Sequence, residues 1–328
     1  MEKDKFYHIG EALDRLISVD VSARGVIGHL YKAARALSDK PLTYSVANLL
    51  SESIKPQDKV ILATGWIDQP EAAPNFGETD GPSGAVILAR ALRLNCQAAC
   101  IIYTNEKLVE GMKKVAQTAG FHCVEPSELD ASIKLGKLMT IAILPFPTDR
   151  VKAQEQAKTV LAEHKPSCCI AVECGGMDEQ GKIYSMNGVD TSKSQAKLDY
   201  IFQEAYRNGI VTIGVGDGGN EIGMANIKKS LYNKAFAPTT EVTLLLAAVI
   251  SNWGCYAVSN MLSALKGNVD YLYNPDMEER ILKNAADSGF HDAIYGCVEY
   301  SVDGCTLPIN KAIVELMREI VVQSMKKL

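Results

Sequence analysis

The sequence lacks the cysteine and histidine spacings that hold zinc. Its 328 residues contain no CxxC pair, and the five histidines show neither HxxxH nor HExxH spacing. The nine cysteines are an odd set, and most lie in apolar runs such as residues 168–172, where thiols behave as small core side chains. The sequence therefore indicates neither a zinc site nor a disulfide framework, and any metal would be a hard cation on oxygen ligands.

The sequence also lacks the common phosphate-binding and nucleophile motifs. It has no GxxxxGK[ST] and no GxSxG, and no GxGxxG opens a helix after the first expected strand. Residues 214–219 do match GxGxxG, but this spacing alone has little specificity and lies late in the chain. Nucleotide binding and nucleophile-elbow chemistry thus have little support.

Positive charge is scarce. Lys and Arg total 34 against 39 Asp and Glu, a net charge of −5, with no basic block, so neither nucleic acid nor a membrane surface is an expected partner. The longest apolar stretch, residues 242–253, is too short to span a bilayer, and we interpret it as a buried helix. The charged residues 1–5 are not followed by an apolar secretory core, so we expect a cytoplasmic protein.

No Ser/Gly/Pro-rich linker and no internal repeat divides the chain. Hydrophobic residues at 47% and charged residues at 22% are typical of a globular enzyme. Apolar spacing predicts a helical N-terminal segment over residues 1–55, packed on a single α/β catalytic domain over residues 56–328. Strands and helices alternate in this domain, which predicts a doubly wound, mostly parallel sheet with helices on both faces.

The expected elements follow from the period of the apolar residues. Strands are expected at residues 59–64, 98–103, 121–124, 140–144, 167–172, 210–213 and 271–273. Helices are expected at residues 86–94, 106–119, 150–163, 194–208, 241–265, 277–286 and 309–326, the fifth as one long buried helix or two joined near Trp253.

Three expected strands end in loops that combine glycine with carboxylates. These loops are Glu78-Thr79-Asp80-Gly81, Glu173-Cys174-Gly175-Gly176 and Asp217-Gly218-Gly219-Asn220-Glu221. Ligands of doubly wound sheets bind beyond the carboxyl ends of strands, and glycine lets a ligand approach the backbone closely. We therefore predict one pocket built from the three loops, although each loop alone is equally compatible with a tight turn that caps a helix.

Two kinds of chemistry suit acids gathered in one pocket. Burial and like charge can raise one pKa and give an acid and base pair near neutral pH, or the carboxylates can bind Mg²⁺ or Mn²⁺. Pro82 fits a first helical turn, whose free amides can hold an anion, and Arg90 one turn later is a candidate partner for a substrate carboxylate. The residues leave the choice between acid–base and metal chemistry open.

The sequence resembles the D-glutamate cyclase family, known in animals as the C-terminal domain of a longer mitochondrial protein and in microbes as a free-standing domain. The specific matches are ETDGPSGA at residues 78–85 and GDGGNEIGM at residues 216–224. Supporting matches are Thr64-Gly65, Glu173 with residues 184–188, Ser251-Asn252-Trp253-Gly254, and Val302-Asp303-Gly304. They run in family order through most of the chain.

The resemblance implies cyclisation of D-glutamate to 5-oxo-D-proline and water, by attack of the α-amine on the side-chain carboxyl. It implies an acidic amino acid as substrate, and it leaves a homo-oligomer open. The residues then expected are catalytic Asp217, Glu173 and Glu221; substrate-binding Thr79, Asp80, Gly81, Ser83, Gly84, Asn187, Gly218, Gly219 and Asn220; and Glu78, Asp80 and Asp217 as ligands of Mg²⁺ or Mn²⁺.

Two other classes of function stay open at this point. One is a non-catalytic sensor or carrier that binds a small anionic amino acid in the same pocket. The other is a metal-dependent hydrolase or lyase that acts on a related amino acid or lactam. Measured turnover of D-glutamate, with and without metal, discriminates among the three.

Overall fold

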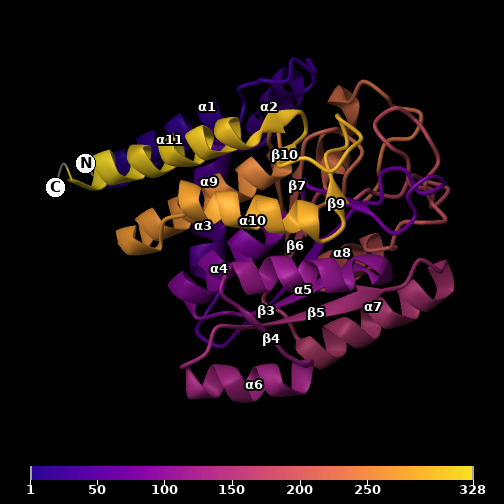
Figure 1. Ribbon diagram of the computed structural model, residues 1–328, viewed down its shortest axis with the longest axis horizontal. Coiled ribbons are helices and arrows are strands. Elements are labelled where there is room, and N and C mark those ends of the chain that lie inside the picture. The colour runs from indigo at the N-terminus through magenta and orange to yellow at the C-terminus, as the bar shows by residue number, and fades with distance from the viewer. Residues whose placement is uncertain (1, 327–328) are drawn as a thin grey trace.

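A parallel sheet of seven strands forms the centre of the molecule in the computed structural model, which describes residues 2–326 (Figure 1). Its order is β4-β5-β3-β1-β6-β7-β8, so the chain builds outward from β1 on one side and then returns to add β6, β7 and β8 on the other. The doubly wound prediction is thereby confirmed. The strands are β1 Lys59–Thr64, β3 Ala99–Asn105, β4 His122–Cys123, β5 Thr140–Phe146, β6 Cys168–Val172, β7 Val211–Gly216 and β8 Leu244–Ala247.

The central strands are buried and mostly apolar because helices cover both faces. All residues of β3 and β6 are buried, and Ile61 of β1 pairs with Ile101 on one side and Cys169 on the other. Cys168 and Cys169 therefore serve as core side chains, as their apolar context predicts.

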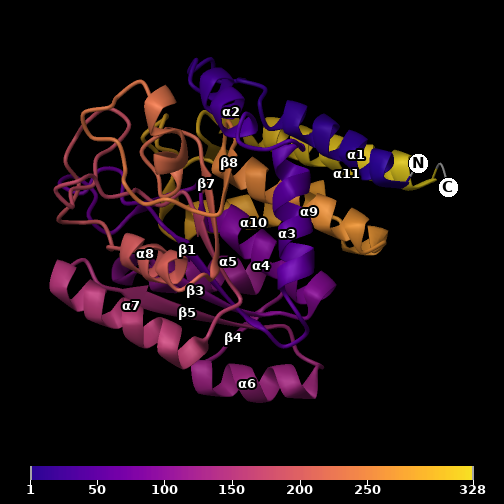
Figure 2. The ribbon, with the colours of Figure 1, turned by 180° about the vertical axis from the view of Figure 1, so that it is seen from behind.

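Helices form a layer on each face of the sheet (Figure 2). One face carries α4 Pro82–Cys96, α5 Val109–Thr118 and α9 Ser251–Leu265, and the other carries α6 Pro126–Leu135, α7 Arg150–His164 and α8 Asp199–Arg207. Every residue of α9 from Ser251 to Ala264 is buried. A helix that is buried all round needs a further layer over it.

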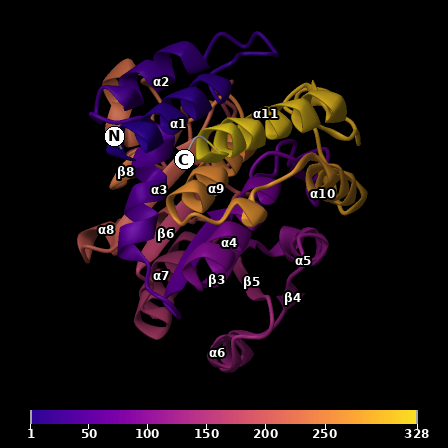
Figure 3. The same ribbon diagram turned by 90° about the vertical axis from the view of Figure 1, so that its left-hand side faces the viewer.

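That further layer comes from the two ends of the chain (Figure 3). It contains α1 Glu2–Leu16, α2 Ile27–Arg35, α3 Leu42–Ser53, α10 Pro275–Asp287 and α11 Leu307–Lys326. Both α1 and α3 pack on α9, and Ile9 and Leu13 join the same hydrophobic core as the sheet. The helical prediction for residues 1–55 is confirmed for α1 to α3, while the division into a segment and a domain stays a prediction.

Residues 241–265 correct one expectation, because they are not a single helix. Residues Leu244–Ala247 form the edge strand β8, which pairs with β7 through Leu244 and Ile213, and α9 begins only at Ser251. A short apolar run satisfies a buried strand and a buried helix equally well, so its period could not discriminate them.

Three smaller expectations also differ from the structure. Residues 271–273 form no strand, because Val269–Tyr271 is a 3-10 turn. Helix α8 begins at Asp199, five residues later than residue 194, where it was expected. Helix α6 was not expected from the sequence. Two further 3-10 turns cover Glu106–Leu108 and Met224–Ser230. Within residues 2–326, no helix combines the length and apolarity needed to cross a membrane.

Two pairs of short strands bring the C-terminal part of the chain over the end of β1. β2 Gly77–Glu78 pairs with β9 Phe290–His291, and β10 Ser301–Val302 pairs with β11 Cys305–Thr306. The turn between β10 and β11 contains Asp303. This carboxylate is thereby placed at the carboxyl edge of the sheet.

Glu278 of α10 is fully buried and makes stability depend on pH. Its carboxylate accepts a hydrogen bond from the Tyr273 hydroxyl, and burial raises its pKa from 4.5 to about 7. The folded state therefore holds this proton more tightly than the unfolded chain, so this group lowers the free energy of unfolding as pH rises from about 4.5 to about 7. We expect Glu278→Gln to add roughly 2–3 kcal/mol at pH 8, measured by urea unfolding.

The neighbouring Glu279 gives a matched control, because its carboxylate pairs with Lys283 and Lys311 at the surface. Glu279→Gln should add no stability at pH 8. An unchanged slope of stability against pH in the Glu278 variant would contradict the assigned role of burial.

Candidate active site

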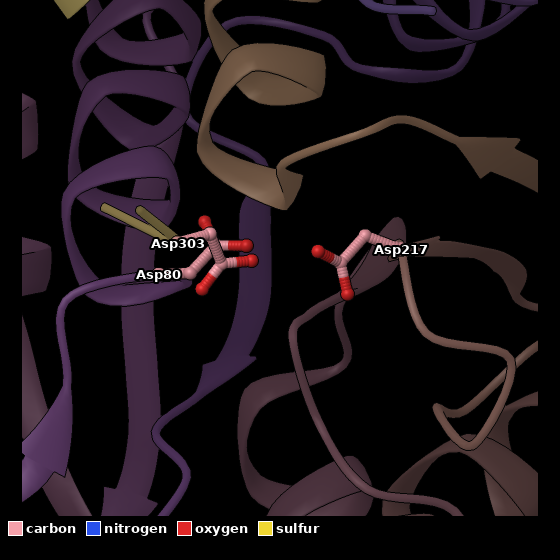
Figure 4. Close-up of side chains that lie close together, drawn as sticks. All are labelled: Asp80, Asp217 and Asp303. Atoms are coloured by element: carbon pink, nitrogen blue, oxygen red, sulfur yellow. The ribbon is translucent and has the colours of Figure 1, made fainter. Parts of the chain in front are cut away.

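Carboxylates from four separate parts of the chain meet at the switch point between β1 and β6. Oxygen atoms of Asp80, Asp217 and Asp303 all lie within 4.8 Å of one another, and so do those of Glu173, Asp217 and Glu221. Figure 4 shows the Asp217 carboxylate directed toward those of Asp80 and Asp303, which approach from the opposite side. The structure thus gathers the three acidic loops around Asp217.

Three of these carboxylates, those of Glu173, Asp217 and Asp303, line a cavity of about 120 Å³, whereas Asp80 and Glu221 lie behind its wall. Pockets for drug-sized ligands measure roughly 300–1,000 Å³, so this one suits a small metabolite. A larger surface hollow of about 380 Å³ beside α6 lacks carboxylates in its lining. The smaller cavity is lined by Arg24, Trp66, Asp68, Glu78, Glu173, Ser185, Met186, Asn187, Asp217, Gly218, Asn220, Ala293, Ile294 and Asp303.

Asp80 joins two helices at the site. It lies just before α4, and its carboxylate accepts hydrogen bonds from the Ser251 and Asn252 amides at the start of α9, at 2.8 and 2.7 Å. Burial, and next the charge of Asp217, raise the pKa of Asp80 to about 7, although the two amides oppose the shift. Asp80 can therefore hold or release a proton near neutral pH.

Backbone amides at the start of α4 already donate hydrogen bonds to a side chain of the protein. The Asn252 side-chain oxygen accepts hydrogen bonds from the Gly81 and Gly84 amides, at 3.0 and 2.6 Å. Thr79 donates its hydroxyl to the Ser301 carbonyl, and Ser83 is fully buried. These four predicted substrate-binding residues shape the site, and direct contact with a substrate stays a prediction. Two of the amide donors expected to hold a substrate carboxylate are engaged by Asn252.

Gly81 allows the start of α4 to approach the ends of β1 and β6 closely. Its φ is +97°, and an added Cβ would lie 2.7 Å from the Thr64 hydroxyl and 2.9 Å from the Glu173 Cβ. We expect Gly81→Ala to lower the free energy of unfolding by roughly 2–4 kcal/mol, measured by urea unfolding. Gly120→Ala is the matched control, because φ there is +95° with nothing within 4 Å. Equal losses in both variants would mean that backbone strain alone, and not crowding, matters at Gly81.

Glu173 follows β6 directly and adopts a strained backbone. Its φ is +49°, and Asp303 has a φ of +47°. Non-glycine residues rarely adopt this region, and such strain gathers at functional sites. The Glu173 carboxylate accepts a hydrogen bond from the Ser251 hydroxyl at 2.6 Å, and burial, together with the charge of Asp217, raises its pKa well above the usual value.

Glu221 holds the loop after β7 in shape. Its carboxylate accepts hydrogen bonds from the backbone amides of Asp217, Gly218 and Gly219. Burial raises its pKa to about 7, with the charge of Asp217 adding to the shift. The arrangement gives Glu221 a positioning role, and its predicted catalytic role stays untested. In the same loop, Asn220 donates to the Tyr184 carbonyl at 3.0 Å.

Two residues at the centre of the site were not among the predicted site residues. Arg24, from the loop between α1 and α2, forms ion pairs with Asp217 at 2.5 Å and with Asp303 at 2.9 Å. For Asp303, the resemblance at residues 302–304 was a signal that could have identified it. No local pattern marks Arg24, which lies 193 residues from Asp217 in the sequence. Arg90, considered from the sequence, does not line the cavity.

The predicted metal ligands are brought together only in part. Asp80 and Asp217 share a group with Asp303, whereas Glu78 belongs to neither three-residue group in the described part of the chain. Glu78 still lines the cavity, and burial, followed by the charges of Asp303 and Asp80, raises its pKa well above the usual value. A cation site on these oxygens would therefore use Asp303 in place of Glu78.

Comparisons with known proteins show which family this chain resembles. The profile of the family described as "D-glutamate cyclase-like, C-terminal" matches residues 13–318. The human protein "D-glutamate cyclase, mitochondrial" is 28% identical over 268 residues, which cover 77% of this chain and 38% of the human protein. The chain thus spans well under half of that relative. Because the relative is named as mitochondrial, the cytoplasmic location stays a prediction for this chain.

The family match covers nearly the whole chain, including the loops that carry Asp80, Asp217 and Asp303. It also includes Arg24 and the N-terminal helices from residue 13 onward. The resemblance seen in the sequence is confirmed, and the chain belongs to the D-glutamate cyclase-like family.

Proposed function

We propose that this protein cyclises D-glutamate to 5-oxo-D-proline and water. The observation that carries the proposal is the cavity around Asp217, where carboxylates from several strand ends and one arginine face a space sized for a small metabolite. Membership of the D-glutamate cyclase-like family and the name of the human relative support it.

The cyclisation neither consumes nor releases protons overall. The substrate ammonium loses two protons as its nitrogen forms the lactam, and the side-chain carboxylate gains two protons as one oxygen leaves as water. The enzyme therefore needs a group that accepts protons from nitrogen and a group that delivers them to oxygen. Holding the flexible substrate bent, with nitrogen near the carboxyl carbon, supplies a further large part of the acceleration.

Asp217 is the proposed base, and Glu173 is the proposed proton donor. Asp217 belongs to both acidic groups, lines the cavity and pairs with Arg24, so it is placed to meet the substrate ammonium. Glu173 also lines the cavity, and burial raises its pKa well above the usual value, which favours proton donation by this group over an ordinary glutamate. Asp80 lies behind the cavity wall near Asp217 and supports the site from there.

A divalent cation fits the chemistry of the donor set. Asp80, Asp217 and Asp303 offer only carboxylate oxygens, which Mg²⁺ and Mn²⁺ prefer. Arg24 neutralises part of the same cluster, so a cation would share Asp217 and Asp303 with it. When bound, such a cation would polarise the substrate carboxyl group.

The test is incubation of the protein with D- and L-amino acids, with and without Mg²⁺ or Mn²⁺, followed by mass spectrometry for loss of water. D-Glutamate should be converted to 5-oxoproline, and L-glutamate should react more slowly. Binding without turnover would instead favour a sensor or carrier. Turnover of another amino acid or a lactam would favour a related hydrolase or lyase, and turnover that survives exhaustive chelation would remove the metal-dependent variants.

A further inference from the structure

The cavity is lined by far more acidic than basic residues. In the described part of the chain, its lining includes five acids and one basic residue, Arg24. D-Glutamate itself has two carboxylates and one ammonium, so acids alone would attract its nitrogen and repel both carboxylates. Arg24 is the lining residue able to form a charged, fork-shaped pair with a carboxylate.

The loop between α1 and α2 holds Arg24 in place. The Asp20 carboxylate accepts hydrogen bonds from the Arg24 amide at 3.0 Å and the Gly25 amide at 2.6 Å. Ala23 has a φ of +55°, which turns the chain sharply before Arg24. The Arg24 side chain is only 14% exposed. A side chain fixed in this way loses little further entropy when it binds a ligand.

The contacts of Arg24 within the protein do not use all of its hydrogen-bond donors. It donates to the Asp217 carboxylate and to the Val249 carbonyl, and it faces Asp303. A guanidinium has five N–H donors; the Nε–H is buried and has no acceptor within residues 2–326, and the four N–H groups of Nη1 and Nη2 have three partners. An Nη N–H can therefore donate to a ligand carboxylate in the cavity that Arg24 lines, in addition to the present partners.

We propose that Arg24 binds the α-carboxylate of the substrate and thereby selects α-amino acids over ω-amino acids. The inference rests on the proposed cyclisation. The side-chain carboxyl must take up protons to lose water, and a guanidinium beside it would favour its charged form. Glu173 lines the same cavity and is held there by the Ser251 hydroxyl, so the side-chain carboxyl belongs beside Glu173, which leaves the α-carboxylate for Arg24. An amino acid such as 4-aminobutanoate, which lacks the α-carboxylate, would gain nothing from Arg24.

Two lactams test this assignment without relying on turnover. 5-Oxo-D-proline carries the carboxylate in question, whereas 2-pyrrolidinone has the same ring without it. We expect Arg24→Gln to weaken binding of 5-oxo-D-proline by roughly 10- to 100-fold in calorimetric titration, with 2-pyrrolidinone changed less than about twofold. Arg24→Lys keeps the positive charge but loses the fork-shaped pair of donors. Its affinity for 5-oxo-D-proline should therefore lie between those of the wild-type protein and Arg24→Gln.

Arg35 provides the matched control, because it pairs with Glu11 at 3.2 Å, outside the cavity lining. Arg35→Gln should change neither affinity. Equal weakening of both lactams by Arg24→Gln would show a structural role and overturn the inference, and so would no weakening of either. Should the glutamine variant fail to fold, the same comparison with Arg24→Lys decides. A wild-type protein that discriminates the lactams through Arg24 but does not turn over D-glutamate would sink the proposed function alone.

Discussion

Asp217→Asn is expected to lower kcat for D-glutamate cyclisation by roughly 10²- to 10⁴-fold, the usual contribution of a general base. Asparagine keeps the shape of the side chain but cannot take the proton from the substrate ammonium. It also weakens the ion pair with Arg24, so KM is expected to rise in the same variant. Steady-state formation of 5-oxoproline, followed by chromatography, measures both quantities.

Two controls separate chemistry from folding in this experiment. Asp130→Asn removes a carboxylate that pairs with Lys59 at the surface and is 51% exposed, so kcat should not change. The thermal midpoint of the Asp217 variant should change little, because the weakened ion pair with Arg24 is offset by relief of repulsion from Asp80 and Asp303, which lie within 4.8 Å. A folded Asp217→Asn protein that keeps more than about a tenth of wild-type kcat would rule out Asp217 as the general base.

Glu221→Ala is expected to cause the largest loss of stability, roughly 3–5 kcal/mol of the free energy of unfolding. The substitution leaves the amides of Asp217, Gly218 and Gly219 without their acceptor in a loop that is largely buried. Each unpaired donor costs about 1–3 kcal/mol, reduced where water reaches it. Urea unfolding followed by circular dichroism gives the value.

The glutamine variant and a surface glutamate complete this test. Glu221→Gln keeps one acceptor oxygen, so its loss should be smaller than that of Glu221→Ala. Glu179→Ala removes an exposed partner of Lys228 and should stay within about 0.5 kcal/mol of wild type. If Glu221→Ala cost less than about 1 kcal/mol, the loop would not depend on this carboxylate.

Local patterns in the sequence were enough to identify three acidic loops at the site. The loops with Glu173 and Asp217 directly follow buried strands, and the loop with Asp80 belongs to the connection after β1; in a parallel sheet the carboxyl ends of the strands lie at one edge. This rule needs no knowledge of which strands are neighbours. It explains why Asp80, Glu173 and Asp217 could be predicted to meet although 137 residues separate the first and last of them.

Roles within the site could not be predicted in the same way. Glu221 has the residue type of a catalytic acid, yet its oxygens hold three backbone amides. Gly81 and Gly84 have the form of an anion-binding turn, yet their amides donate to Asn252. A carboxylate or amide has the same chemistry whether its partner is a ligand or the protein, and only the packed structure shows which partner lies within reach.

By itself, the sequence determined the family, the parallel α/β sheet and the acidic edge, because these follow from apolar periods and from short glycine-rich motifs. The tertiary structure alone decided that residues 244–247 extend the sheet and that Arg24 and Asp303 complete the site. Arg24 comes from the helical N-terminal segment and Asp303 from a turn near the other end. Contacts between segments so far apart depend on how the layers pack around α9, which no local pattern encodes.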